Sequence, residues 1–494
     1  YEAVLGVSYT KMVKKNYVTF NGGYNVSSTD LRSHGYSVLG FPADELNDPG
    51  FGLDYHPEKK PTGNSELSRM AGFFGNLNYT YDNRYFADFS VRADASSRFG
   101  ADKRWAVFWS AGVGYNLHNE VFLKKLEWVS LLRLRASYGV TGGQNFNPYQ
   151  AMTTYRFITD KWYGYGSGAE MLALGNDDLK WQSTVQKNFG LDLGMWKDRL
   201  TLTFNYYHKL SENSLTDVTL PPSLGFPSYK ENLGEVVNKG WEFTLRGFVV
   251  KKEDFNIMLS VNGAQNNNKL KKISNSLKAF NEEQDKQVEN KVMARYVEGQ
   301  SLNTIWVVRS LGIDPANGKE LFLDKNGKRT YDWNADDYVA EATTDPRLYG
   351  NLGLGIFYRG FSLNTYVNYS LGEKAYNQTL VDRVENADKH YNCDRRVLYD
   401  RWHKPGDETF FKDVKDASVT RPTSRFVQKN NYLNMTSLNV AYEFNPRLLD
   451  PLRIKYLKLA FYMTDLFRIS TMKAERGLDY PFARTFTTSL QIRF

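Results

Sequence analysis

The sequence is short of cysteine and of long apolar runs. Cys393 is the only cysteine among 494 residues, so no disulfide can form within the chain, and cysteine usage does not reveal the redox compartment. No segment approaches the roughly 20 consecutive apolar residues that a membrane helix needs. A helical membrane span is therefore excluded, whereas a membrane β-barrel is not, because half of the residues in each barrel strand are polar.

Motifs for catalysis and for metal binding are also missing. The six histidines are widely spaced and form no His-x-x-x-His or Glu-x-x-His pattern. There is no Gly-x-Ser-x-Gly motif and no phosphate-binding loop. Adjacent carboxylates, such as Asp177 with Asp178, are commoner in solvated turns than in acid/base pairs. We therefore expect no enzymatic activity, no metal site and no cofactor.

One acidic segment leaves an alternative open. Residues 324–328 begin like a calcium-binding loop, but the bidentate glutamate that such a loop needs downstream is absent. We interpret the segment as a β-turn, and a calcium ion in an outer loop is the weaker alternative.

Linkers and shifts in composition are absent as well, which predicts a single domain over residues 1–494. The net charge of +8 is modest for this length and both signs are interspersed, which argues against a nucleic-acid partner. The chain begins at Tyr1 without a signal segment, which indicates a mature or truncated product. Aromatic residues are abundant, as expected in membrane-interface belts and on sugar-stacking surfaces.

The last ten residues alternate strictly between polar and apolar or small side chains. This amphipathic pattern, with an aromatic carboxy-terminus, is typical of the last strand of an outer-membrane β-barrel, although a strand of a soluble sandwich fits the segment alone equally well. We interpret the outward residues as an assembly signal: Phe486, Leu490, Ile492 and Phe494.

Similar alternation recurs in segments of about ten residues, the length of a tilted membrane strand. About fourteen such segments are present: 3–10, 76–82, 84–92, 106–116, 131–139, 187–196, 199–209, 240–249, 255–263, 350–359, 361–370, 434–444, 455–464 and 485–494.

The connections between these segments are sorted by length. Tight polar turns occupy 81–84, 196–199, 251–254 and 358–361, and they alternate with long connections at 11–73, 140–186, 210–239, 264–349 and 371–433, with shorter ones at 93–105 and 466–484. This predicts an all-β fold, a transmembrane antiparallel barrel with short periplasmic turns and long extracellular loops. The loop 264–349 is predicted to carry its own hairpin at 304–312 and 320–323, and the inner turn 116–130 to be partly helical around 121–128. In a soluble adhesin or glycan-binding module, nothing would require the short connections to lie at one end and the long connections at the other.

Seven short motifs punctuate these strands: Arg92–Gly100, Leu134–Gln144, Gly234–Glu242, Asp345–Gly350, Tyr358–Leu363, Asn431–Leu433 and Asp465–Phe467. In this order they resemble the barrel of SusC/RagA-type TonB-dependent outer-membrane transporters of Bacteroidota, over nearly the whole chain.

The resemblance implies active import of oligosaccharides or peptides into the cell across the outer membrane. A SusD-like surface lipoprotein would close over the barrel, the TonB complex would supply energy, and a dimer of such transporter–lipoprotein pairs is a further alternative. Members have a plug, a TonB box and a 22-stranded barrel, so the sequence resembles the carboxy-terminal part of such a barrel. The runner-up is a passive porin of about fourteen strands that close on themselves.

Aromatic residues of the long loops are candidates for substrate binding, because flat rings with polar edges stack on sugars or hold peptides. Packing of the loops or contact with the lid is the alternative for each of them. The candidates are Trp162, Tyr163, Tyr165, Trp306, Tyr331, Trp333, Tyr391 and Trp402.

Charged residues at the polar positions of the strands are predicted to face the lumen or the plug, where buried charges are usually paired. They are Asp88, Arg92, Arg133, Arg135, Asp192, Glu242, Arg246, Glu443 and Lys458.

Overall fold

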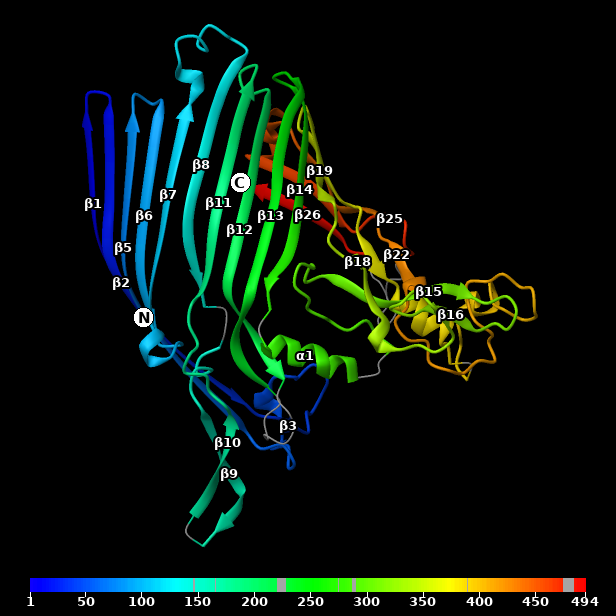
Figure 1. The fold of residues 1–494 in the computed structure, drawn as a ribbon. Coiled ribbons are helices and arrows are strands. Elements are labelled where there is room, and N and C mark those ends of the chain that lie inside the picture. The colour runs from blue at the N-terminus through cyan, green and yellow to red at the C-terminus, as the bar shows by residue number, and fades with distance from the viewer. Residues whose placement is uncertain are drawn as a thin grey trace.

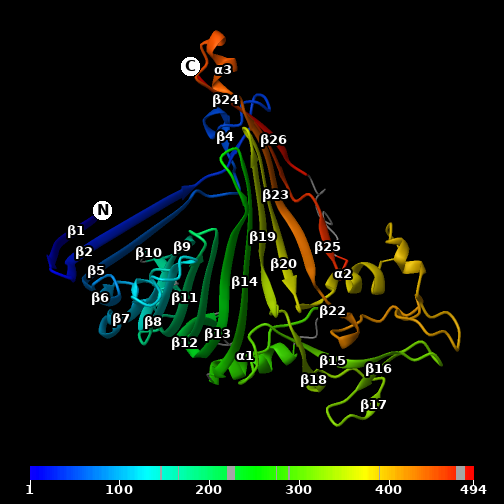
Figure 2. The ribbon, with the colours of Figure 1, turned by 90° about the horizontal axis from the view of Figure 1, so that it is seen from above.

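A single curved antiparallel sheet dominates the computed structural model (Figures 1 and 2), which describes residues 1–144, 147–164, 166–219, 228–273, 275–286, 290–388, 390–473 and 484–494. Its strands, in sheet order, are β1 (Glu2–Val13), β2 (Asn16–Gly35), β5 (Thr62–Tyr81), β6 (Tyr85–Ser96), β7 (Trp105–Asn116), β8 (Val129–Gly143), β11 (Gln182–Met195), β12 (Leu200–Thr219), β13 (Ser228–Lys251), β14 (Phe255–Lys272), β19 (Leu348–Tyr358), β20 (Phe361–Leu371), β23 (Tyr432–Glu443), β24 (Tyr456–Thr464) and β26 (Phe486–Arg493), with β25 (Arg468–Ser470) beside β23. The predicted all-β fold is confirmed.

Smaller elements lie in the long connections. They are β3 (Val38–Leu39) with β4 (Asp54–Tyr55), β9 (Thr154–Tyr163) with β10 (Gly166–Ala173), the four-stranded sheet of β15 (Thr304–Ile313), β16 (Glu320–Leu323), β17 (Arg329–Thr330) and β18 (Tyr338–Thr343), and β21 (Lys374–Tyr376) with β22 (Val427–Lys429). The described α-helices are α1 (Asn275–Lys286), α2 (Gln378–Leu380) and α3 (Pro446–Leu449). None of the helices in the described ranges is long and apolar enough to cross a membrane.

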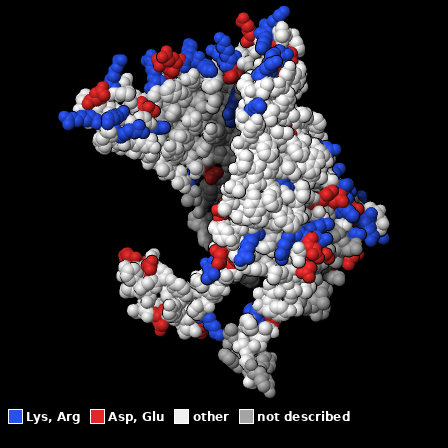
Figure 3. All heavy atoms as spheres, turned by 90° about the vertical axis from the view of Figure 1, so that its left-hand side faces the viewer, with Lys and Arg blue, Asp and Glu red and all other residues white. Residues whose placement is uncertain are grey.

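The two faces of the sheet differ in the way that strand alternation predicts. On β6, Tyr85 and Phe89 lie on the outer face and are 46% and 45% exposed, whereas Asp94 on the inner face is 6% exposed. Charged side chains gather towards the two ends of the molecule in Figure 3, and a broad surface with few charges lies between them. An exposed apolar surface of this extent suits hydrocarbon rather than water.

The expected loop 11–73 is wrong at both ends, because β2 occupies residues 16–35 and β5 begins at Thr62. The chain turns at Lys14, which has a positive φ of 54°, and Lys15 Nζ lies 3.1 Å from Asp82 Oδ2, so this turn belongs to the end with the short turns. The glycine pair inside β2 interrupts its apolar alternation, which hides the strand in the sequence. A Cβ on Gly23 would lie 2.3 Å from the carbonyl oxygen of Leu5, so close strand contact requires glycine there.

The extra strand changes the count and the direction of β1. In the described part of the chain, the path through the sheet holds fifteen strands, since β25 lies off it. Because all the wall pairs are antiparallel, β1 and β26 run in the same direction. Within the described residues each pairs with one neighbour only, so the wall is open, and closing it on itself would need a parallel pair. The runner-up hypothesis, in which about fourteen strands close on themselves, is therefore not supported.

Several strands continue beyond the length that a membrane requires. β12 and β13 pair from Leu200 with Gly247 up to Thr219 with Ser228, so most of the expected loop 210–239 is a paired hairpin. The loop expected at 264–349 begins only after Lys272, at the end of β14. In the inner turn, a 3-10 helix at Leu117–Asn119 and hydrogen-bonded turns replace the helix expected around 121–128.

Candidate binding site in the outer loops and on the inner face

The two longest connections pack together into one body, which we call the loop body (residues 290–347 and 373–430). The amide of Val308 on β15 donates to the carbonyl of Pro422 at 3.2 Å, and the amide of Ser310 donates to Ser424 Oγ at 3.0 Å. Figure 2 shows β15 and β16 running beside β22 at the edge of the wall. Segments more than 100 residues apart in the sequence thus form a single surface.

A buried ionic cluster joins the two segments of the loop body. Arg425 Nη2 lies 2.7 Å from Glu320 Oε2 and 2.6 Å from Glu385 Oε1, and all three side chains are almost fully buried. Burial alone would lower the pKa of Arg425, but the Coulombic attraction of both carboxylates and their hydrogen bonds outweigh it and raise the pKa. The Arg425 guanidinium also lies 4.5 Å from the ring centre of Phe426, which forms an apolar cluster with Val381, Val384, Val397 and Phe411.

A second buried cation, the Arg401 side chain, binds backbone carbonyls within the segment 377–412. Its guanidinium donates to the carbonyls of Val397 at 2.7 Å, of Lys412 at 3.0 Å and of Glu385 at 3.2 Å, and also to that of Val384. Burial lowers the pKa of Arg401. The segment has little regular secondary structure. The hydrogen bonds from Arg401 therefore satisfy backbone carbonyls that a β-sheet or helix would otherwise pair.

A cavity of about 720 Å³ lies between the two segments of the loop body. Tyr331 and Trp333 line it from one segment, and Lys412 and Arg421 line it from the other. The Arg421 guanidinium lies 4.9 Å from the centre of the Trp333 ring, and the Trp333 indole donates to Pro422 O at 3.2 Å. Glu320, Asp332 and Asp416 line it as well, so the cavity presents aromatic rings among charges of both signs, an arrangement that suits a polar ligand.

Two of the candidate aromatic residues pack inside the loop body instead. Trp306 is 9% exposed, with the Arg295 guanidinium 5.7 Å from its ring centre. Trp402 donates from Nε1 to Pro315 O at 2.9 Å, and its ring covers Gly318 so closely that a Cβ there would lie 2.5 Å away. In this conformation both rings support the fold of the loop body, which was the alternative weighed for each of them.

The remaining candidates are not brought together with this cavity. Tyr391 is 77% exposed on the surface of the loop body. Trp162 and Tyr163 belong to β9, but their side chains, like the whole of Tyr165, lie outside the described part of the chain. The hairpin of β9 and β10 stands apart from β15 and β16 in Figures 1 and 2.

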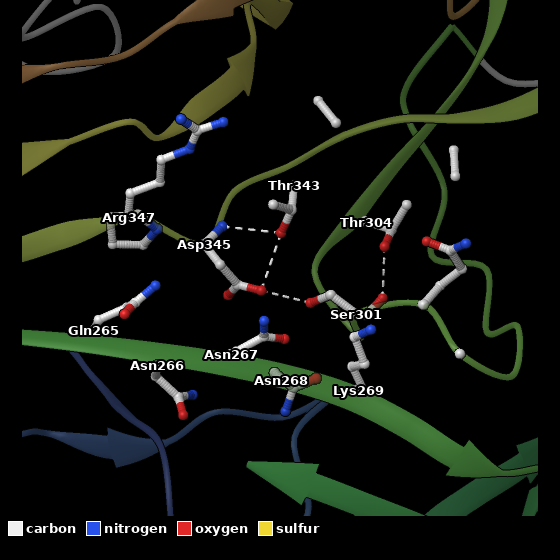
Figure 4. Close-up of a pocket in the computed structure, with 15 residues that line it drawn as sticks. Gln265, Asn266, Asn267, Asn268, Lys269, Ser301, Thr304, Thr343, Asp345 and Arg347 are labelled. Atoms are coloured by element: carbon white, nitrogen blue, oxygen red, sulfur yellow. Dashed lines mark hydrogen bonds between the residues drawn. The ribbon is translucent and has the colours of Figure 1, made fainter. Parts of the chain in front are cut away.

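A polar pocket of about 470 Å³ lies where β14 meets the loop body (Figure 4). Its centre is Asp345, whose carboxylate accepts from Ser301 Oγ at 2.5 Å, from Thr343 Oγ1 at 3.0 Å and from Asn303 Nδ2 at 2.7 Å. Both oxygens of the Asp345 carboxylate therefore accept hydrogen bonds from the protein. It fixes the start of β19 to the start of β15 and leaves the neighbouring amides to face the pocket.

On the inner face, three of the predicted charges form a connected network. Arg135 Nε donates to Asp192 Oδ2 at 2.9 Å, and Arg135 Nη2 donates to Asn205 Oδ1 at 3.1 Å. Asn205 Nδ2 in turn donates to Glu242 Oε1 at 3.3 Å. The network crosses β8, β11, β12 and β13. Arg135 and Asp192 neutralise each other, whereas Glu242 accepts from a neutral amide.

Two further arginines of the predicted set also have partners. Arg92 Nε lies 2.6 Å from Asp94 Oδ2 and Arg92 Nη2 donates to Asn25 Oδ1 at 2.8 Å, while Arg133 Nε donates to Asn116 Oδ1 at 2.7 Å. Asp94 was not among the predicted residues, although it shares the alternation of Arg92.

The other four lie on the same face without an ion pair to any described residue: Asp88, Arg246, Glu443 and Lys458. Glu443 and Lys458 are register partners on β23 and β24. Asp88 fills the space over Gly112, where a Cβ would lie 2.5 Å from its carboxylate.

A set of asparagines that we call the amide ladder was missed by the sequence analysis. Tyr207 Oη donates to Asn266 Oδ1 at 3.1 Å, and Asn238 Oδ1 accepts from Asn266 Nδ2 at 3.0 Å and from Asn268 Nδ2 at 2.9 Å. Asn268 Oδ1 accepts from the amide of Leu302, so the ladder reaches the loop body. The run of amide side chains at residues 265–268 is the signal that could have revealed it.

Within the described ranges, no group of three or more His, Cys, Asp or Glu gathers. The Asp324 carboxylate accepts from the amides of Asn326 and Lys328, both at 2.8 Å. These hydrogen bonds lower the pKa of Asp324, and the bond from the Lys328 amide has the largest effect. They are the bonds of the predicted β-turn, and a calcium ion would have to displace them.

Comparison with known proteins assigns this architecture. A model of the family described as "TonB dependent receptor-like, beta-barrel" matches residues 5–380, well over half of the chain. The chain belongs to this family. Proteins of this kind lie in the bacterial outer membrane, and so does this one. The family comprises receptors and transporters rather than enzymes.

Individual relatives agree with the predicted SusC/RagA-type resemblance. The TonB-dependent receptor SusC of Bacteroides thetaiotaomicron is 28% identical over 474 residues, covering 88% of this chain and 45% of SusC. The TonB-dependent receptor P3 of Formosa agariphila is 25% identical over 542 residues, covering 98% of this chain and 52% of that protein. The structure of the RagAB peptide transporter shares the fold, with a TM-score of 0.85, 24% identity and coverage of 99% of this chain and 55% of that chain.

The chain spans about half the length of the curated relatives it matches. Since barrels of the outer membrane have short periplasmic turns and long outer loops, the end that carries Lys14 and Asp82 faces the periplasm. The loop body and the outer part of the amide ladder then face the outside of the cell.

Proposed function

We propose that this barrel protein forms the wall of an outer-membrane importer for oligosaccharides or peptides. A SusD-like lipoprotein would cover the outer mouth, and the TonB complex would supply the energy for uptake. SusC is named as a TonB-dependent receptor and RagAB as a peptide importer, and the similarity of this chain to both supports the proposal.

The amide ladder is the observation that carries the proposal furthest. Its asparagines lie on the inner face, between the charged network of Arg135 and the start of the loop body at Leu302. Amide groups both donate and accept, so they can exchange their mutual hydrogen bonds for those of sugar hydroxyls or peptide groups. A neutral polar path of this kind suits uncharged or mixed-charge polar substrates better than metal complexes or lipids.

The loop body supports the proposal of a lid partner. It offers a preformed surface outside the mouth, with Tyr391 exposed on it and the cavity of Tyr331 and Trp333 beside it. A rigid surface loses little conformational freedom on binding. We extend the proposal to a dimer of transporter–lipoprotein pairs, and we propose that transport uses no bound cofactor or metal ion.

Transport by the native protein tests the proposal. Cells carrying the protein, and cells lacking it, would be given a library of labelled oligosaccharides and peptides, with and without an uncoupler of the inner membrane. We expect uptake of one substrate class that disappears in both the mutant and the uncoupled cells. A lipoprotein should co-purify with the protein from the outer membrane.

A passive channel gives a different result. Its uptake would persist in uncoupled cells, and the purified protein would conduct ions continuously in a planar bilayer. Either finding would contradict the energised importer.

A further inference from the structure

A free edge of the sheet bounds one side of the polar pocket shown in Figure 4. β14 pairs with β19 only as far as Ala264 with Tyr349, although β14 continues to Lys272. Pro346 lies just before β19 and has no amide hydrogen for a further ladder bond. In the described part of the chain, β14 therefore lines the pocket with residues 265–269 and has no strand beside it there.

The register shows which backbone groups of β14 face this pocket. In an antiparallel sheet, alternate residues turn their N–H and C=O groups to opposite neighbours. Leu270 turns its groups to the pocket side, because its amide donates to Gln300 O at 2.8 Å and Gln300 lines the pocket. Gln265 turns its carbonyl to β13 instead. Since the pairing with β13 has no shift in between, Asn266 and Asn268 turn both of their backbone groups towards the pocket.

These backbone groups are available to a ligand. The side-chain oxygen of Asn268 accepts from the amide of Leu302 at 3.1 Å, but no described residue bonds to the backbone of Asn266 or Asn268 on the pocket side. An open strand edge is a docking site for an extended peptide, which adds to the sheet as one more strand. Alternate residues of a strand are about 7 Å apart, which is also the repeat of such a peptide.

The lining of the pocket suits a peptide better than a sugar ring. None of the described residues that line it is aromatic, so it offers no flat surface on which a sugar could stack. Its polar side chains include those of Gln265, Ser301 and Thr304, and the small residues Ala340 and Ala342 leave room between them. A pocket of this kind can accept the backbone of a peptide whose side chains vary.

Two cations of the pocket are available to a carboxylate. Lys269 of β14 and Arg347 before β19 both line the pocket (Figure 4), both are exposed, and neither forms an ion pair with a described residue. Asp345 is the acid among the described lining residues, and its carboxylate already accepts from Ser301, Thr343 and Asn303. A ligand carboxylate would therefore meet two cations that lack a partner.

We propose that this pocket binds the transported substrate as an extended peptide that adds to the edge of β14. The backbone groups of Asn266 and Asn268 pair with alternate residues of the peptide, and Lys269 and Arg347 bind its carboxylates. The inference rests on the proposed function and narrows its substrate class from oligosaccharides or peptides to peptides. Recognition through the backbone admits many sequences, so carboxylates and length would set the preference.

The first test determines what the protein binds and through which atoms. The protein, purified from outer membranes with any lipoprotein that accompanies it, is given a proteolytic digest of casein and a mixture of starch and mucin oligosaccharides, and mass spectrometry identifies the bound molecules. The most strongly retained peptide is then synthesised with a single N-methyl group at each residue in turn. We expect affinity to fall roughly ten-fold at alternate residues and to change little at the residues between them, because only alternate N–H groups point to β14. Losses that do not alternate would overturn the proposal.

A pair of variants tests the strand edge itself. Asn266→Pro removes the amide hydrogen that faces the pocket and no ladder bond to β13, whereas Asn266→Ala removes the side chain and keeps that hydrogen. We expect the peptide to bind roughly ten-fold more weakly to Asn266→Pro than to Asn266→Ala. Equal affinities would contradict pairing through the backbone. The heat-dependent gel shift of both variants shows whether the barrel has folded, and the N-methyl series decides the question should Asn266→Pro fail to fold.

A second pair of variants tests the cations. Lys269→Gln with Arg347→Gln should weaken binding of the peptide roughly ten-fold, and it should not affect the same peptide with its carboxylates converted to amides. Lys124→Gln with Lys125→Gln, in the exposed inner turn, is the matched control. An equal effect on the peptide and on its amide form would contradict binding of a carboxylate by these cations.

Uptake by cells separates this inference from the proposed function. Energy-dependent uptake of oligosaccharides without uptake of peptides would overturn the peptide site and leave the importer in place. Absence of energy-dependent uptake of both classes would overturn the proposed function instead. We expect energy-dependent uptake of peptides, with Asn266→Pro slower than Asn266→Ala.

Discussion

At the scale of single residues, the cations of this protein are held in contrasting environments. Arg425 is enclosed with two carboxylates, and its side chain is 4% exposed. Arg135 on the inner face is 38% exposed and shares its bonds between Asp192 and Asn205. Arg309 is 57% exposed and pairs with Glu341 at 3.2 Å. The contribution of each ion pair to the free energy of unfolding depends more on the burial of its side chains than on its N–O distance.

Replacing Arg425 with glutamine should loosen the whole loop body. Glu320 and Glu385 would remain buried without a counter-charge, and breaking a buried pair in this way costs about 3–5 kcal/mol. Hydrogen exchange should therefore accelerate in both 304–343 and 377–426 while β5 to β7 keep their protection. Arg309→Gln is the control and should cost at most about 1 kcal/mol. Faster exchange in only one of the two segments would contradict their union through Arg425.

Acid should loosen the same region. The Arg396 side chain, by its hydrogen bond, lowers the pKa of Asp394 to about 2, and the Tyr331 hydroxyl lowers the pKa of Asp314. A carboxylate whose pKa is lowered by folding stabilises the folded state at any pH above its ordinary, unfolded-state pKa. This stabilisation is lost as the pH falls through the pKa of the folded state. We expect near-ultraviolet circular dichroism of the loop body to change between about pH 4 and pH 2. Asp394→Asn should reduce that change, and a signal that is flat down to pH 2 would refute the prediction.

At the scale of elements, the sheet depends on glycines where neighbouring strands approach closely. A Cβ on Gly240 of β13 would lie 2.0 Å from the carbonyl oxygen of Gln265 on β14, whereas a Cβ on Gly143 of β8 would meet nothing within 4 Å. Gly240 lies in the motif Gly234–Glu242 and is the first residue of the predicted segment 240–249. Its role as a spacer between two strands became visible only in the register.

Gly240→Val should therefore impair assembly of the wall, while Gly143→Val should not. The backbone of Gln265 cannot move aside without breaking ladder bonds, so separation of β13 from β14 is the expected result. Folded protein in isolated outer membranes can be measured by the heat-dependent shift of barrel proteins in gel electrophoresis. We expect at least a ten-fold loss for Gly240→Val. Equal losses in the two variants would show that bulk, rather than the contact with Gln265, is responsible.

At the scale of the whole molecule, the wall and the loop body meet through the amide ladder. Asn268 binds Leu302 at the start of the loop body, and Asn238 holds Asn268 from the neighbouring strand. The same residues face the proposed path of the substrate. The ladder can thus serve both the position of the loops and the passage of polar groups.

Asn238→Ala should leave the barrel assembled but slow uptake. The substitution removes the acceptor that Asn266 and Asn268 share, and a hydrogen bond of this kind contributes about 1 kcal/mol. We expect uptake of the transported substrate to fall by roughly five-fold, with unchanged protein levels in the membrane. Asn78→Ala, a change at an inner position of β5 away from the ladder, is the control. Uptake that falls equally in both variants would rule out a specific role of the ladder.

The sequence by itself determined the strand periodicity, the inner and outer faces and the family, because alternation and turn chemistry are local properties. It did not reveal β2, because Gly22 and Gly23 interrupt the apolar pattern. Only the tertiary structure decided that Arg425 joins two loops, that Trp306 is buried and that an edge of β14 lies free beside a pocket. Those features arise from contacts between residues distant in the chain, and no local pattern encodes which distant residues meet.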